Sequence, residues 1–147
     1  MQDNLDHART ELQITRMREA AQKGICCFCR ENFEEYHTAP VEIENDSCLV
    51  TKNDFPYEGT VGHFLIVTKR HVALPQDMTE KEWRDFYSIF SDLLSKYPCE
   101  GGALVMRFGD PSYTGATIVH LHAHVIQGVS GKPGDERLAA YLGYKAT

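Results

Sequence analysis

Residues 118–126 read IVHLHAHVI, so that His120, His122 and His124 alternate with Leu121 and Ala123. Residues two apart lie on the same face of a strand, whereas on a helix they point in different directions. The β-branched residues on both sides of the histidines also favour a strand. The segment therefore predicts one strand that carries three imidazoles on one face and apolar side chains on the other.

Three histidines on one face of a strand indicate a functional site. A lone histidine is usually an ordinary surface or core residue, but three adjacent imidazolium charges repel one another. Such a cluster should lower the pKa of at least one ring and keep neutral imidazoles available. Neutral imidazole is both a nucleophile and a metal ligand. The spacing alone does not decide between these two uses.

The rest of the chain predicts a single α+β domain over residues 1–147. Thr79 and Glu82 form a capping-box pattern before an apolar stripe, and Pro98 follows it. Several strands beside one long helix favour an antiparallel sheet of about five strands with that helix packed on it. The expected strands cover 41–43, 47–52, 63–68, 103–108 and 118–126, and the expected helices cover 6–23, 79–97 and about 136–142, with a loop over 109–115. Residues 1–24 are expected to be an N-terminal helical extension, and 128–147 a C-terminal tail with a short helix.

Composition restricts the class of protein. Hydrophobic residues make up 42% of the 147 positions and charged residues 24%, which is typical of a globular domain. The formal net charge of −6 argues against a nucleic-acid-binding protein. No apolar run is long enough to span a membrane, and the polar N-terminus does not resemble a signal peptide. These features predict a cytoplasmic protein with no membrane partner.

The five cysteines suggest a metal site. Cys26 and Cys29 have the C-x-x-C spacing that places two thiolates on one ion. Tetrahedral zinc needs two further ligands, for which His71 and one of the three histidines are candidates. A redox pair and buried free thiols remain alternatives. Cys48 and Cys99 are expected to be ordinary buried cysteines.

The pattern resembles that of the histidine-triad (HIT) superfamily. Residues 120–126 resemble its signature, Cys26–Cys29 its zinc-binding cysteine pair, and 62–71 its upstream strand with two histidines. Gly115-Ala116-Thr117 is similar to the turn before the triad, and residues 53–57 resemble the branch that handles dinucleoside polyphosphates. The nucleoside phosphoramidase branch is similar as well. The resemblance covers about residues 25–127.

The resemblance implies a role for each matching residue. His122 corresponds to a nucleophile that forms a covalent nucleotidyl-imidazole intermediate, and His63 and His124 to histidines that flank the phosphate. Asn53 corresponds to a ribose contact and Thr117 to a hydroxyl near the phosphate. The implied ligands of a structural zinc ion are Cys26, Cys29, His71 and His120. The family also implies a homodimer.

Departures from the family pattern leave the substrate open. Arg107 stands where many members have asparagine, and its guanidinium is suited to clamp a phosphate. Gln127-Gly128 replaces a common Pro-Arg after the triad. The sequence therefore predicts a nucleotide hydrolase or transferase that acts at the α-phosphorus of a dinucleoside polyphosphate or a nucleoside phosphoramidate. A nucleotide-binding or sensing module with little catalysis is the alternative, and a regulator of metal availability is a third interpretation.

Overall fold

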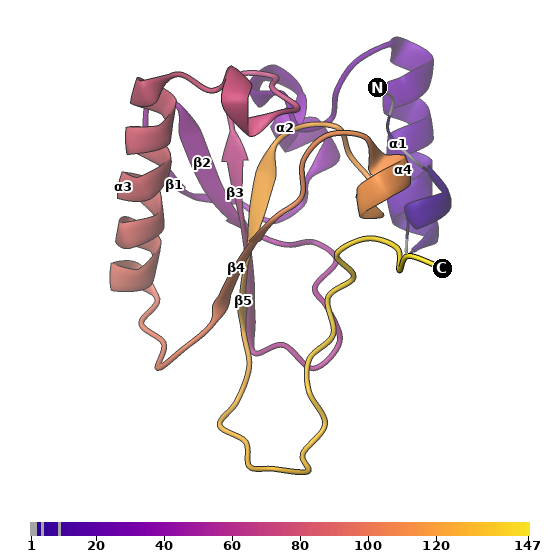
Figure 1. Ribbon diagram of the computed structural model, residues 1–147. Coiled ribbons are helices and arrows are strands. Elements are labelled where there is room, and N and C mark those ends of the chain that lie inside the picture. Colours follow the sequence, from indigo (N-terminus) through magenta and orange to yellow (C-terminus); the bar gives the residue numbers. More distant parts are fainter. Residues whose placement is uncertain (1–2, 4, 9) are drawn as a thin grey trace.

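The computed structural model describes residues 3, 5–8 and 10–147, which form one sheet with helices on both of its faces (Figure 1). The helices are α1 (Glu11–Lys23), α2 (Arg30–Tyr36), α3 (Glu80–Lys96) and α4 (Pro111–Thr114), with 3-10 turns η1 (Leu5–His7) and η2 (Pro75–Asp77). The strands are β1 (Val41–Glu44), β2 (Cys48–Lys52), β3 (Gly62–Thr68), β4 (Ala103–Met106) and β5 (His122–Gln127). Among the described residues, no helix has the length and apolar character that a membrane span requires.

The sheet is antiparallel throughout. Its strands lie in the order β1-β2-β3-β5-β4, so that β3 and β5 form the centre. In the central pair, Leu65 lies opposite His124, and Val67 lies opposite His122. The predicted α+β class, with an antiparallel five-stranded sheet and one long helix, is confirmed.

Helix α3 covers one face of the sheet. Thr79 caps it and forms the predicted capping box with Glu82, which satisfies backbone N–H groups at the helix start. The buried residues of α3 are Phe86, Ile89 and Leu93. They belong to one apolar core with side chains of the sheet, among them Val50, Phe64, Ile66, Ala123 and Val125. This side of the sheet is the α3 face.

The opposite side of the sheet carries the histidines and is the histidine face. Phe33 of α2 packs there against Leu49, Leu65 and Val67. Because side chains alternate along a strand, the same strand β5 turns Ala123 and Val125 toward α3 and His122 and His124 the other way. The predicted two-sided character of this strand is therefore correct.

Several predicted boundaries differ from the structure. Strand β5 begins at His122, so that His120 lies just before the strand, although the Phe28 ring contacts both His120 and His122. Helix α1 begins at Glu11, because Thr10 caps it there by accepting a hydrogen bond from the backbone N–H of Gln13. Helix α2 was not predicted, since only Phe33 and Tyr36 of its seven residues are buried.

The predicted C-terminal helix over about 136–142 is wrong. These residues adopt no helix or strand. Arg107 donates to the main-chain carbonyl of Tyr141, so the tail is held by a residue from outside it. A helix of this length is also marginal in water without tertiary packing, and Leu138, Tyr141 and Leu142 are exposed.

Candidate functional site

A cavity of about 1400 Å³ opens on the histidine face. Its walls come from the ends of the central strands, from α1 and from the C-terminal tail, which are far apart in sequence. Five of the predicted site residues line it together: Asn53, Arg107, Thr117, His122 and His124. The sixth, His63, is 5% exposed and lies in contact with His124. The structure thus gathers the predicted catalytic and substrate-binding residues around one space.

His122 is held with one ring nitrogen directed at the main chain. Its Nδ1 lies 2.6 Å from the carbonyl oxygen of His120, which can only accept, so the proton of the neutral ring is on Nδ1. Nε2 therefore carries a lone pair. Burial lowers the pKa of His122 to about 4, and the positive charge of Arg107 acts in the same direction. The ring is consequently neutral at pH 7 and has the electronic form of a nucleophile.

His63 and His124 form a hydrogen-bonded pair beside His122. The backbone N–H of Tyr57 donates to Nδ1 of His63, at 3.0 Å, which assigns the proton of His63 to Nε2. This Nε2 lies 2.9 Å from Nδ1 of His124, so His124 accepts there and carries its own proton on Nε2. The Tyr57 ring stacks on His124, with centroids 5.5 Å apart. The arrangement fixes the orientation and tautomer of both rings.

Asn53 contacts this pair directly, and Arg107 reaches it through Tyr57. The side-chain nitrogen of Asn53 is 3.1 Å from Nε2 of His63, and its Oδ1 accepts from the backbone N–H of Phe55. Nη2 of Arg107 donates to the Tyr57 hydroxyl, at 3.0 Å. Arg107 also donates to the carbonyl of Tyr141 from Nε and from Nη2, at 2.8 and 2.6 Å. This second contact, with the C-terminal tail, has no signal in the sequence.

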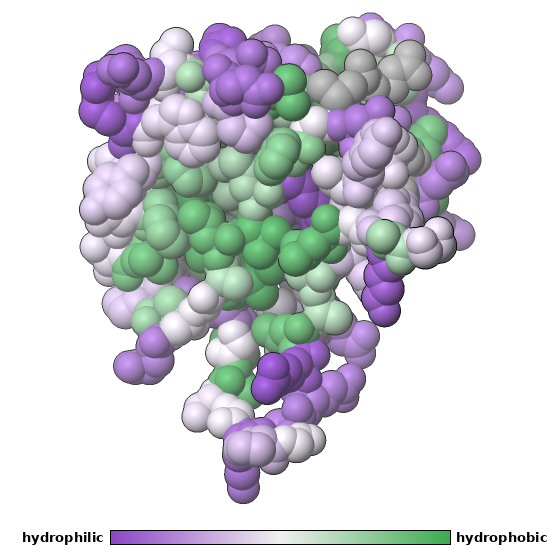
Figure 2. All heavy atoms as spheres, viewed as in Figure 1, coloured by the Kyte–Doolittle hydropathy of each residue, from purple (hydrophilic) through white to green (hydrophobic). Residues whose placement is uncertain are grey.

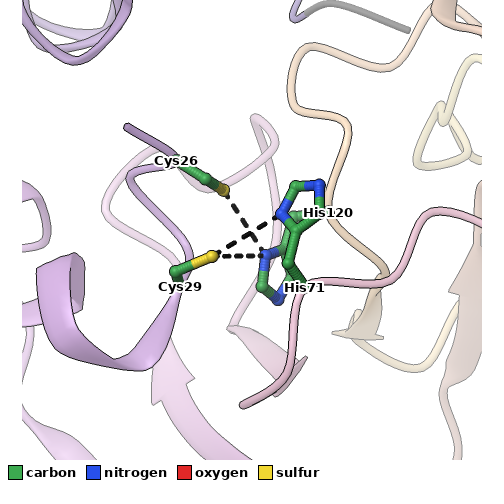
Figure 3. A group of neighbouring side chains, drawn as sticks. All are labelled: Cys26, Cys29, His71 and His120. Atoms are coloured by element: carbon green, nitrogen blue, oxygen red, sulfur yellow. Dashed lines mark hydrogen bonds between the residues drawn. The ribbon is translucent and has the colours of Figure 1, made fainter. Parts of the chain in front are cut away.

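The cysteine pair meets two histidines next to the cavity. The ligand atoms of Cys26, Cys29, His71 and His120 all lie within 4.8 Å of one another, and Figure 3 shows the four side chains converging from three loops. Sγ of Cys26 is 3.4 Å from Nδ1 of His120. Sγ of Cys29 is 3.6 Å from Nδ1 of His71 and 3.8 Å from Nδ1 of His120.

This donor set fits a tetrahedral metal ion. Zinc–sulfur and zinc–nitrogen bonds of usual length at a tetrahedral angle place sulfur and nitrogen about 3.5 Å apart, close to the separations found here. Nε2 of His120 lies 2.6 Å from the Thr68 carbonyl, so its proton is there and Nδ1 is left as the ligand atom. Burial raises the pKa of the Cys26 thiol, and that of Cys29 to about 12, so a nearby cation is needed to hold both as thiolates.

The structure adds residues that the sequence reasoning missed. Phe28 packs edge-on against the ring of His122, with centroids 5.0 Å apart. Arg16 of α1 donates to Asp54, which also accepts from the backbone N–H groups of Thr38 and Ala39. This ion pair attaches α1 to the loop that follows Asn53. No pattern in the sequence indicates this ion pair, because Arg16 and Asp54 are far apart in the chain.

One expectation about a single residue needs correction. Of the cysteines expected to be ordinary buried residues, Cys48 is buried but Cys99 is exposed. Among the nearby aromatic residues, Phe55 and Tyr57 line the cavity. Phe64 instead belongs to the apolar core under α3, on the other side of the sheet.

Comparison with known proteins gives a consistent picture. The HIT domain family matches residues 36–131 of this chain. No curated protein sequence matches it. The matched range includes the histidines of the cavity, whereas α1, the cysteine pair and most of the C-terminal tail lie outside it.

Solved structures are similar in fold. A HIT family hydrolase from Clostridium thermocellum is 23% identical over 74% of this chain and 94% of its own, with a TM-score of 0.59. A zinc-bound histidine triad family protein from Mycobacterium smegmatis is 18% identical over 78% of this chain and 82% of its own, with a TM-score of 0.57. A hypothetical protein from Leishmania major is 17% identical over 87% of this chain and 84% of its own, with a TM-score of 0.62.

Proposed function

Because this chain belongs to the HIT domain family, we propose that it is a nucleotide hydrolase or transferase in which His122 attacks the α-phosphorus of its substrate. The substrate is a dinucleoside polyphosphate or a nucleoside phosphoramidate. The observation that carries the proposal is the hydrogen-bond pattern of His122, which leaves a lone pair on Nε2 beside the His63–His124 pair. All three rings adjoin one cavity large enough for a nucleotide.

The proposed reaction has two steps. In the first, Nε2 of His122 forms a bond to the α-phosphorus, and the bond from phosphorus to the leaving group breaks. The N–H group at Nε2 of His124 donates a hydrogen bond to the leaving group, which takes up its proton from solvent. In the second step, water attacks the phosphorus, the bond to His122 breaks, and the proton of the water is released to solvent. Inorganic phosphate can replace water, which gives a transferase.

The substrate-binding roles follow the walls of the cavity. Asn53 contacts the ribose, Thr117 supplies a hydroxyl near the phosphate, and the charge of Arg107 favours the anion. Phe55 and Tyr57 offer aromatic surfaces to a base.

We propose that a zinc ion with a structural role would be held by Cys26, Cys29, His71 and His120. Bound zinc would fix the loop before β5, and with it the position of His122 two residues after the ligand His120. The four-residue ligand set leaves no open coordination position for a substrate. The cytoplasm, where thiols stay reduced, suits this site.

The expected homodimer is proposed to form along β4. This strand lies at the edge of the sheet and exposes Leu104, which is 43% accessible. Figure 2 shows an apolar area in the middle of the face on which Figure 1 places β4. Substitution Leu104→Asp should convert a dimer to a monomer in sedimentation velocity experiments, and a monomeric parent protein would contradict the proposal.

Product analysis tests the function. Diadenosine polyphosphates and adenosine phosphoramidates are incubated with the enzyme, with and without inorganic phosphate, and the acceptor is identified from the products. Substitution His122→Ala should abolish turnover and the covalent nucleotidyl adduct that mass spectrometry detects after a rapid quench, while the melting temperature is retained. Turnover by His122→Ala would refute the proposal. Tight AMP binding without turnover of any substrate would instead support the sensing module.

A further inference from the structure

We propose that residues 128–144 form a strap that closes the cavity, and that Arg107 is the positioning residue that holds the strap in place. The strap supplies a large part of the cavity wall, including Leu138, Tyr141 and Tyr144. It lies almost entirely outside the matched HIT domain. The proposal rests on the proposed function only for the identity of the ligand that the strap encloses.

The first anchor of the strap is Leu138. A Cβ atom added to Gly59 would lie 3.1 Å from one methyl carbon of Leu138, and a Cβ on Gly128 would lie 3.0 Å from the other. Leu138 therefore sits between two glycines, where its methyl groups approach the main chain closely. The contact joins the middle of the strap to the loop after β2, and to the first residue of the strap itself, which directly follows β5.

The second anchor is Arg107. Its Nε and Nη2 both donate to the carbonyl oxygen of Tyr141. Hydrogen bonds from a charged donor are stronger than those between neutral groups, and two from one guanidinium also fix its orientation. Because Nη1 does not take part in these bonds, Arg107 can hold the strap and still direct a donor and a positive charge into the cavity.

The third anchor is a close approach of two main chains. Gly143 has φ +142°, and a Cβ atom at this position would lie 2.8 Å from the carbonyl oxygen of Tyr113 in α4. A side chain there would force the strap away, since the obstacle is backbone. Three anchors spread over six residues indicate that this segment packs against the rest of the domain and keeps a defined position beside the cavity.

The strap is also connected to the catalytic histidines. The guanidinium that holds Tyr141 donates to the Tyr57 hydroxyl, and the Tyr57 ring stacks on His124 while its backbone N–H binds His63. A displaced strap therefore removes a restraint on Arg107, and through Arg107 on Tyr57. Arg107 thereby links a wall of the cavity that lies mostly outside the matched HIT domain to the histidine pair.

The order of the strap tests the role of Arg107 without any ligand. Heteronuclear NOE values of the backbone amides of residues 138–144 are measured by NMR in the full chain. Both Arg107→Gln and Gly143→Ala should make these amides mobile. The matched controls are Arg84→Gln, an exposed arginine of α3, and Gly101→Ala, where an added Cβ meets nothing within 4 Å. A strap that stays ordered in Arg107→Gln would overturn the proposal, and so would one already mobile in the parent protein.

AMP binding, measured by calorimetry, tests whether the strap belongs to the binding site. Gly143→Ala should weaken AMP binding by about tenfold, since it displaces this wall of the cavity while the Arg107 side chain is still present. Gly101→Ala, at a glycine that does not line the cavity, should bind like the parent protein. Unchanged affinity with a mobile strap would overturn the proposal. If the parent protein does not bind AMP at all, the nucleotide function fails, while the NMR result still decides whether Arg107 holds the strap.

Discussion

The two faces of the sheet are built from the same strands and yet differ in chemistry. On the α3 face, Ile66, Ala123 and Val125 pack against a single helix within one apolar core. On the histidine face, His63, His122 and His124 take the alternate positions, and the cover consists of several short segments. The alternation of side chains along a strand makes this possible, because one face can be optimised for burial while the other holds ionisable groups at fixed spacing.

This difference between the two faces predicts which substitutions change stability and which change function. Residues of the α3 face contribute apolar burial and contact nothing in the cavity. Residues of the histidine face are held by directed hydrogen bonds and by the Cys26–His120 cluster. Substitutions on the first face should therefore change stability and leave turnover per folded molecule unchanged, and substitutions on the second should affect the site.

The largest effect on stability is expected from Cys29→Ser. It should remove the metal, from about one zinc per chain to none, because a structural site requires all of its thiolates. The loss should lower the free energy of unfolding by roughly several kcal/mol, because metal binding contributes directly to folding. Elemental analysis and thermal melting measure the two outcomes. The control is Cys99→Ser, at an exposed cysteine away from the cluster. Equal melting temperatures in both variants would show that the cluster does not stabilise the fold.

The second largest loss of stability is expected from an unfilled space created under α3. Ile89 is fully buried, so Ile89→Ala should cost about 2–5 kcal/mol in urea unfolding, from lost burial and an unfilled space. The rate constant kcat per folded molecule should stay at the parent value. Leu94→Ala, at a half-exposed position of the same helix, should cost much less. A large fall in kcat for Ile89→Ala would mean that the two faces are mechanically coupled.

The sequence predicted one face better than the other. Strand and helix periodicity placed Ala123, Val125 and Phe86 in the core, because burial follows local pattern. The C-x-x-C spacing and the family resemblance also identified the four residues whose ligand atoms converge in the structure, which are Cys26, Cys29, His71 and His120. The contacts of Arg107 with Tyr141 and of Arg16 with Asp54 were not predictable, since they join distant segments with no periodic signal. The short α2 was missed for a different reason, because its two buried residues are too few to define a period.

His37 provides a pH-dependent test of the histidine face. It stacks on Phe33, and its Nε2 donates to the Lys52 carbonyl. Burial lowers the pKa of His37 below its usual value of 6.5, although the carboxylate of Asp54 opposes the shift. The unfolded chain therefore binds a proton more readily, so stability is complete above pH 6.5 and decreases as the pH falls below it.

The variant His37→Gln isolates this contribution, because glutamine can still donate to the Lys52 carbonyl. Urea unfolding at pH 7 and pH 5 should show a smaller loss of stability in the variant than in the parent protein. The other histidines are common to both proteins and cancel in the difference. An identical loss in both would mean that His37 takes up its proton equally well in the folded chain.

The smallest effects on stability are expected from removal of the two helix caps. The two variants also allow the two faces of the sheet to be compared directly. Thr79 caps α3 and Thr10 caps α1 through hydrogen bonds to backbone N–H groups, and loss of such a cap costs about 1 kcal/mol. Thr79→Ala should lower the free energy of unfolding by that amount and leave AMP affinity unchanged, since α3 is remote from the cavity. Thr10→Ala should instead weaken AMP binding, because the frayed turn of α1 contains Gln13, which lines the cavity. Calorimetry and urea unfolding of both variants separate these outcomes. Equal AMP affinities would show that α1 only borders the site and takes no part in binding.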